Sequence, residues 1–270
     1  MPEPGWKLTV LGVVQDAGMP HLACRKPPCT DVRAGKRKPE KVSCIGIRDE
    51  ETGASYIFDA TPDFREQLHA LNGGEAPDGI FLTHAHIGHY TGLMYLGKES
   101  INAIEVPVYC TRKMAEFLTS NGPWSLLVKN KNIVLRVVEP DKPVDLPGGM
   151  RVTPFLVPHR EEFTDTVGYM IEGPRKRVVF IPDIDRWEKW DRSVRDLADE
   201  VDLLFLDGSF SSPAEIGSRD ITQIPHPMMP HTRELLRGTR GELWFIHLNH
   251  TNPALCGGKD VAREGMEFDL

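Results

Sequence analysis

Three histidines lie close together in the stretch "FLTHAHIGHYTGL", residues 81–93. His84, His86 and His89 fall within six residues directly after an apolar run, and imidazole nitrogens at this spacing suit a metal site. Gly88 stands between the second and third histidines, where a carboxylate would be expected. The stretch therefore predicts a metal centre that lacks one acidic ligand.

Aspartate and histidine recur where other apolar runs end. Six such runs deliver a side chain that can bind a metal: Asp59, His84, His159, Asp183, Asp207 and His247. The ordinary role of any one of them is that of a turn or cap residue. Their recurrence beside the histidine cluster favours a common site, because α/β folds assemble sites at the edges of their sheets.

Short β-type runs alternate with helical patterns and must position these side chains. Strands are predicted at residues 7–14, 42–48, 55–60, 79–83, 106–110, 133–138, 151–157, 167–173, 177–181, 202–207 and 242–247, and helices at 62–71, 111–120, 186–200 and 231–238. The segment from Gln15 to Lys41 is too long for a simple connection and needs an anchor of its own. No linker is evident, so one α/β domain over residues 1–270 is predicted.

The composition limits the function. The chain has 270 residues and a net charge of −7, with charges of both signs scattered along it. An extended nucleic-acid surface or a basic membrane patch is therefore not expected. A small-molecule substrate is expected instead. No apolar run approaches the roughly 18 residues of a membrane span, so a cytoplasmic protein is expected unless a signal peptide has been removed. Five cysteines, an odd number, argue against a disulfide framework. Formation of a homodimer is compatible with the sequence.

The motifs resemble those of the metallo-β-lactamase superfamily. The stretches "THAHIGH" and "FIPDID", with His159 and His247, resemble its successive metal motifs, of which the first has the pattern H-x-H-x-D-H. The stretches "DATPDF", "LLFLDGSF" and "IHLNHTNPAL" are most similar to pyrroloquinoline quinone biosynthesis protein B and its relatives. The cysteine-containing loop also resembles that of the cyclic phosphodiesterase of phosphonate breakdown. The resemblance runs from the first strand almost to the C-terminus and implies a four-layer αββα sandwich.

The resemblance also implies the ligands of two metals. The first would be held by His84, His86 and His159, and the second by His89, a bridging Asp183 and His247. Three imidazoles with an open fourth position suit zinc, and iron or manganese would be tolerated. The second site should bind more weakly because position 88 is glycine, unless Asp185 or Asp207 compensates.

Further residues are candidates near this edge. His226 in "IPHPMMPH" is a candidate for a catalytic role beside Asp183 and Asp207, although a loop histidine flanked by prolines is ordinarily a surface residue. The resemblance also brings Asp16 in "QDAGMP" toward the same edge, within reach of substrate.

The expected chemistry follows from the metal. Zinc lowers the pKa of a bound water from ~15.7 to about 7, so hydrolysis of a small ester or phosphodiester is the expected reaction. Two alternatives stay open: an oxidative enzyme of cofactor biosynthesis that uses iron, and a non-catalytic metal-binding scaffold. Restoring the carboxylate with Gly88→Asp is predicted to raise occupancy of the second site and to improve hydrolysis of a generic phosphodiester.

A structural zinc is predicted in the long loop. Cys24 and Cys29 lie in "CRKPPC", and His250 follows His247 by three residues. Isolated cysteines at this spacing are ordinarily free thiols, but the resemblance implies a cysteine cluster here, closed by a histidine, in which Lys26 replaces one cysteine. His21 and Cys44 are candidates for the fourth ligand. A closed tetrahedral site of this kind stabilises the fold and has no position for substrate.

Overall fold

Seven strands form the first sheet of the structure, a computed structural model that describes residues 5–216 and 224–270. They are β1 (Trp6–Gly12), β2 (Cys44–Asp49), β3 (Ser55–Phe58), β4 (Gly79–Phe81), β5 (Val106–Cys110), β6 (Ile133–Val137) and β13 (Glu267–Asp269), and their order is β13-β1-β2-β3-β4-β5-β6. The strands β3 to β6 are parallel neighbours. The predicted hairpin β2–β3 is present, with Arg48 opposite Ser55.

Six strands form the second sheet. They are β7 (Val144–Asp145), β8 (Arg151–Val157), β9 (Thr166–Glu172), β10 (Arg177–Ile181), β11 (Leu203–Asp207) and β12 (Glu242–Ile246), and their order is β12-β11-β10-β9-β8-β7. The strands β10, β11 and β12 are parallel, whereas β9 is antiparallel to both β8 and β10. The strands β10 and β11 are buried along most of their length, in keeping with their nearly continuous apolar sequences.

The two sheets pack face to face through a buried core that draws residues from both. Phe58 and Phe81 of the first sheet stack with ring centroids 5.0 Å apart. Tyr169 of the second sheet meets both rings edge-on at 5.5 Å. Its hydroxyl donates a hydrogen bond to the carbonyl of Leu82. This aromatic contact joins the sheets just below the segment that carries His84.

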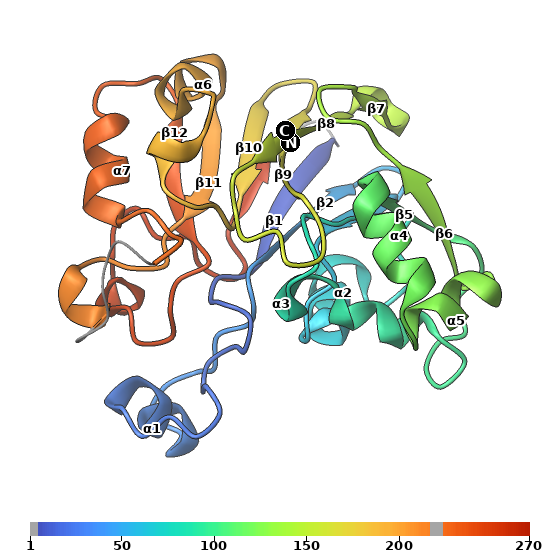
Figure 1. Ribbon diagram of the computed structural model, residues 1–270, viewed down its shortest axis with the longest axis horizontal. Coiled ribbons are helices and arrows are strands. Elements are labelled where there is room, and N and C mark those ends of the chain that lie inside the picture. Colours follow the sequence, from blue (N-terminus) through green and yellow to red (C-terminus); the bar gives the residue numbers. More distant parts are fainter. Residues whose placement is uncertain (1–4, 217–223) are drawn as a thin grey trace.

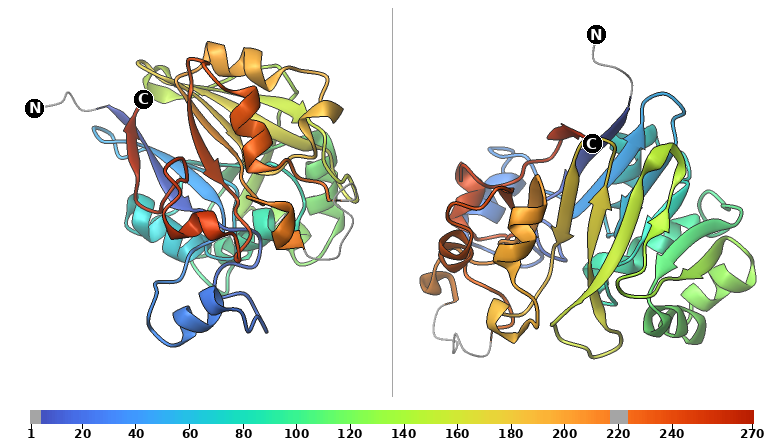
Figure 2. Two further views of the ribbon diagram at one scale, coloured as in Figure 1. Left: turned by 90° about the vertical axis from the view of Figure 1, so that its left-hand side faces the viewer. Right: turned by 90° about the horizontal axis from the view of Figure 1, so that it is seen from above.

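Helices cover the outer face of each sheet. The first sheet is covered by α2 (Phe64–Asn72), α3 (Ile87–Tyr90), η1 (Thr91–Leu96), α4 (Arg112–Ser120) and α5 (Trp124–Lys129). The second is covered by η3 (Trp187–Lys189), α6 (Val194–Glu200) and α7 (Met229–Leu235). The remaining helical segments are α1 (Pro27–Arg33), η2 (Pro147–Gly149), η4 (Pro213–Ile216) and η6 (Pro253–Cys256). Figures 1 and 2 show the resulting layers, which confirm the predicted αββα sandwich.

The short elements β7, β13 and α5 are not among the expected elements, and two further segments differ from the expectation. The helix predicted at 186–200 is instead η3 followed by α6, because Trp190 donates its indole N–H to the carbonyl of Leu156 and Ser193 caps α6 by accepting a hydrogen bond from the backbone N–H of Asp196. The long segment 15–41 contains the short helix α1, which projects from the rest of the molecule (Figure 1). Across the described residues, no helix has both the length and the apolar character needed to cross a membrane.

Strand directions explain why the site residues share an edge. The strands β1 and β3 are both antiparallel to β2, and β4 is parallel to β3, so all three point the same way. In the second sheet β8, β10, β11 and β12 likewise share one direction. Side chains that follow these strands therefore leave each sheet at a single edge, as loops at such edges do in many α/β sites.

Candidate metal centre

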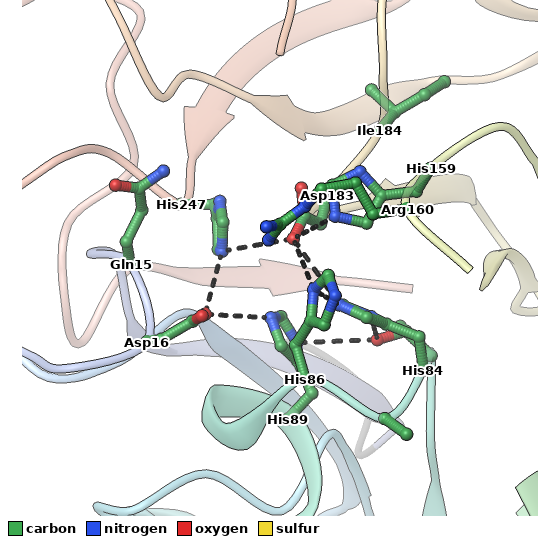
Figure 3. Close-up of polar contacts among 12 residues, drawn as sticks. Gln15, Asp16, His84, His86, His89, His159, Arg160, Asp183, Ile184 and His247 are labelled. Carbon is green, nitrogen blue, oxygen red and sulfur yellow. Dashed lines mark hydrogen bonds and ion pairs between the residues drawn. The ribbon is translucent and has the colours of Figure 1, made fainter. Parts of the chain in front are cut away.

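Four side chains predicted from the sequence meet at this edge. His84 follows β4, His86 precedes α3, His159 follows β8 and Asp183 follows β10. One donor atom from each lies within 4.8 Å of the other three. The Nε2 atoms of His159 and His84 lie 3.2 and 3.5 Å from Asp183 Oδ2, and His84 Nε2 lies 2.8 Å from His86 Nδ1 (Figure 3). The set could hold one metal ion through three imidazoles and a carboxylate.

Hydrogen bonds determine which nitrogen of each ring faces the centre. The Thr83 hydroxyl lies 3.0 Å from both oxygens of Asp59 and 2.9 Å from His84 Nδ1. Since a hydroxyl has one proton, it donates to Asp59 and accepts from His84 Nδ1. His86 Nε2 donates to the Glu162 carboxylate at 3.0 Å. These assignments leave His84 Nε2 and His86 Nδ1 with free lone pairs, as metal ligands require.

A second group lies beside the first. His89 in α3 donates from Nδ1 to Asp59 Oδ2 at 2.7 Å, so its Nε2 faces Asp16 Oδ1 at 3.3 Å. His247, after β12, brings its Nε2 to 3.5 Å from the same oxygen and 3.8 Å from Asp183 Oδ2. The predicted set of His89, Asp183 and His247 is thus brought together, and Asp16 joins it (Figure 3).

Several donor atoms in these two groups are buried and make no hydrogen bond. They are Asp16 Oδ1, His89 Nε2, both ring nitrogens of His159, Asp183 Oδ1 and His247 Nε2. Buried polar atoms without partners are rare in folded proteins and call for an explanation. Cations placed among these atoms would satisfy those that face the centre, which for His159 is Nε2, so the residues present fit a metal centre.

The electrostatics of the first group also suit a cation. Burial alone would raise the pKa of Asp183, but His159, His247 and His226 outweigh burial and hold that pKa well below its usual value. Burial and the neighbouring His89 lower the pKa of His84 far below its usual value. Asp183 is therefore ionised and His84 neutral, which are the protonation states that bind metal.

The three residues predicted to be catalytic also meet. His226 donates from Nδ1 to Asp207 Oδ2 at 2.7 Å, and the same nitrogen lies 3.3 Å from Asp183 Oδ1. Burial opposes protonation of the ring, but Asp207 and Asp183 outweigh it and raise the pKa of His226 to about 9. With 11% of its side chain exposed, His226 is not the ordinary surface residue that its flanking prolines suggest.

Asp185 does not compensate for the missing carboxylate at position 88. Its carboxylate pairs with Lys189 at 2.6 Å and accepts a hydrogen bond from the backbone N–H of Arg186. Asp207 is committed to His226 and to the backbone N–H of Ser209 at 2.8 Å. Of the two compensating residues considered from the sequence, only Asp207 reaches the donor groups, on the side of His226.

Sequence reasoning missed the partners that orient the histidines. The sequence identifies Asp59 only as an aspartate after a strand, whereas in the structure its carboxylate accepts hydrogen bonds from both His89 and Thr83. Glu162 carries no sequence signal, since it lies in a loop far from His86 in the chain. Asp59 and His247 have positive φ angles of 70° and 62°. This backbone region is uncommon outside glycine and recurs at functional sites.

A cavity of about 260 Å³ opens beside the second group. Its walls include Gln15, Asp16, Arg160, Asp183, His226 and His247. The volume admits only a small molecule, because pockets for drug-sized ligands are roughly 300–1,000 Å³. Arg160 brings a guanidinium group to this otherwise acidic and imidazole-rich wall.

The predicted structural cluster also assembles. One donor atom each from Cys24, Cys29 and His250 lies within 4.8 Å of the others. Burial and His21 lower the pKa of His250 to about 4, so the ring is neutral near pH 7. The His21 ring stacks on His250 with centroids 4.3 Å apart, but none of its nitrogens joins the group of donor atoms. Cys44 is not one, because its thiol is buried in the outer core of the first sheet and contacts backbone carbonyls there.

Similarity to known proteins shows the family of the chain. The β-lactamase superfamily domain matches residues 55–248. Coenzyme PQQ synthesis protein B of Nitrosococcus oceani is 28% identical over 311 residues, covering 97% of this chain and 99% of its own, and that of Azotobacter vinelandii is 26% identical over 309 residues, covering 97% and 99%. Among solved structures, zinc-bound PqqB from Methylobacterium extorquens has a TM-score of 0.83 at 21% identity and covers 98% of this chain and 100% of its own. A diphosphatase of the PhnP family has a TM-score of 0.72 at 22% identity, with 98% and 97% covered. The chain therefore belongs to the metallo-β-lactamase superfamily and is similar over nearly its whole length to coenzyme PQQ synthesis protein B.

Proposed function

We propose that the chain is a metal-dependent hydrolase of a small ester or phosphodiester. The observation that carries this proposal is the convergence of buried imidazole and carboxylate atoms without hydrogen-bond partners at the wall of a small polar cavity. Such an arrangement leaves unsatisfied polar atoms beside a cavity in which a reacting group could be bound.

The first metal would be held by His84 Nε2, His86 Nδ1, His159 Nε2 and Asp183. Three neutral imidazoles with a carboxylate suit zinc, and iron or manganese would be tolerated. The zinc in the similar PqqB structure supports zinc. When bound, a divalent cation lowers the pKa of a coordinated water and polarises a phosphoryl or carbonyl oxygen.

The side chains around the cavity would bind the substrate and move its protons. Arg160 would bind an anionic oxygen of the substrate, because its guanidinium lines the cavity beside Asp183. His226 has Nδ1 committed to Asp207, so its Nε2 is the ring nitrogen left to exchange a proton with a leaving oxygen. Asp207 would act as a positioning residue that holds the ring of His226. The fold shared with a diphosphatase of the PhnP family supports a substrate that contains phosphorus.

The test compares metal content and turnover in one preparation. The chain is purified without added metal, its metals are counted, and hydrolysis of bis(p-nitrophenyl) phosphate and p-nitrophenyl acetate is measured before and after chelation and readdition of zinc. We expect His159→Ala to lose one metal and at least 100-fold in turnover with the fold intact, because it deletes a ligand after a strand rather than core volume. The control His69→Ala alters an exposed histidine of α2 and should change neither. A chain that binds no metal at the histidine cluster would refute the proposal.

An oxidative enzyme of cofactor biosynthesis is the second candidate. It is favoured by the similarity to coenzyme PQQ synthesis protein B over 97% of this chain. Oxygen uptake by the iron-loaded chain, combined with failure to hydrolyse either ester, would favour this candidate over hydrolysis. A fully metal-loaded chain with neither activity would instead be a binding scaffold.

A further inference from the structure

The space beside Gly88 is filled by a distant part of the chain. A Cβ atom added at Gly88 would lie 2.5 Å from Asp16 Oδ1 and 2.6 Å from Asp16 Cα. Position 88 therefore has no room for a side chain. The carboxylate found there comes from the segment that follows β1.

Backbone hydrogen bonds hold Asp16 in this place. The N–H of Gln15 donates to the carbonyl of Leu248 at 3.0 Å, and the N–H of Leu248 donates to the carbonyl of Val13 at 2.8 Å. The segment after β1 is thus tied to the segment after β12, which carries His247. These bonds position the backbone next to Asp16 relative to the segment that carries His247.

Two ring nitrogens face the Asp16 carboxylate. His89 gives its Nδ1 proton to Asp59, so Nε2 is the ring nitrogen that faces Asp16 Oδ1, at 3.3 Å. His247 Nε2 lies 3.5 Å from the same oxygen. All three atoms are buried and make no hydrogen bond. A ring nitrogen and a carboxylate oxygen at this distance need a shared cation, either a proton or a metal ion, between them.

We propose that Asp16 is the carboxylate ligand of a second metal, held with His89, His247 and the bridging Asp183. Asp16 takes the place of the aspartate that the H-x-H-x-D-H pattern has at position 88. The inference rests on the metal centre of the proposed function. The second site lacks an acidic ligand in the sequence motif, and Asp16, from the segment after β1, would supply that ligand and complete a two-metal site.

The test measures metal binding rather than turnover. The full chain is stripped with a chelator and titrated with cobalt(II), and binding is followed by visible absorption and by calorimetry. Asp16→Asn keeps the size of the side chain and removes its charge, and Asp16→Ala removes the ligand. We expect both variants to bind one metal fewer per chain, or to bind the last one at least 100-fold more weakly, with the first site unchanged. The control is Asp141→Asn, whose carboxylate pairs with Arg192 at the surface.

The outcomes separate the inference from the proposed function. If Asp16→Asn binds as many metals as Asp141→Asn, with the same affinities, Asp16 is no ligand while the metal centre itself stands. If the wild-type chain binds none at the histidine cluster, the proposed function fails first, and a proton on His89 accounts for the geometry. Anomalous diffraction from a zinc-soaked wild-type crystal needs no variant: the second peak should lie within about 2.0–2.2 Å of an Asp16 oxygen. A peak bound to Asp207 and His226 instead would overturn the assignment.

Discussion

Adding a single methyl group at Gly88 should damage the centre. In Gly88→Ala the new Cβ would lie 2.6 Å from Asp16 Cα, whereas carbon atoms in contact prefer about 3.5–4.0 Å. The Asp16 backbone must therefore retreat from α3 by roughly 1 Å. Metal–ligand distances tolerate deviations of about 0.2 Å. A shift of this size would carry the Asp16 carboxylate out of binding range.

The stability effect follows from two opposing terms. Alanine in place of a helical glycine ordinarily stabilises by about 1 kcal/mol. Overpacking of a tight contact costs roughly 1–3 kcal/mol, and here the contact is with backbone, which cannot rotate away as a flexible side chain can. The net loss is up to about 2 kcal/mol, or a fall in melting temperature of up to about 8 °C. The structure thus reverses the expectation from sequence that Gly88→Asp would restore a ligand, because the larger side chain meets the same backbone.

Differential scanning fluorimetry of the metal-free chain and the cobalt titration measure the two effects separately. We expect affinity for the second metal to fall at least 100-fold in Gly88→Ala, since even loss of an orienting partner costs about 10- to 100-fold. Gly122→Ala is the matched control, because a Cβ added there meets no atom within 4 Å. If Gly88→Ala keeps the melting temperature and the second-site affinity of Gly122→Ala, close approach of Asp16 is not the reason for the glycine.

Three other substitutions probe contacts around the centre. Asp59→Asn removes the charge that orients His89, so affinity for the second metal should fall about 10- to 100-fold in the cobalt titration, and an unchanged affinity would contradict this role. Cys24→Ser should remove about 2 kcal/mol of stability, lower the melting temperature by roughly 4–8 °C and speed proteolysis within residues 15–41. The control Cys256→Ser, at an exposed thiol, should have none of these effects. Arg160→Gln should raise KM for an anionic phosphodiester about 10-fold or more and leave a neutral ester nearly unaffected, because a charged hydrogen bond contributes ~1.5–3 kcal/mol. Equal effects on the two substrates would argue against a charge contact at Arg160.

Local pattern was enough to predict most of the strands and several metal-capable side chains at their ends. The buried strands β10 and β11 are short apolar runs, and an aspartate closes β11 and follows β10 by two residues, so both strand and carboxylate can be read from nearby residues. His84 and His86 are neighbours in the chain, and the short segment between β4 and α3 leaves them little freedom to separate. Sequence alone therefore predicts the geometry where residues are neighbours in the chain or follow the regular spacing of a strand or helix.

The tertiary structure decided the contacts between distant segments. The sequence offered Asp185 and Asp207 as replacements for a missing carboxylate, and the fold turned Asp185 toward Lys189 and Asp207 toward His226. It brought Asp16 to the position instead. No local pattern reports such a choice, because it depends on how closely the segment after β1 approaches α3 once the two sheets have packed.

Gly88 shows the boundary between the two kinds of information. In the sequence it is an absent ligand, and in the structure it is the space occupied by the backbone of Asp16. Because glycine has no side chain, the sequence alone does not show which neighbouring segment needs the space at position 88. Periodicity and spacing determined where the strands and most metal-capable side chains lie, whereas close packing of segments far apart in the chain determined which carboxylate faces His89 and His247.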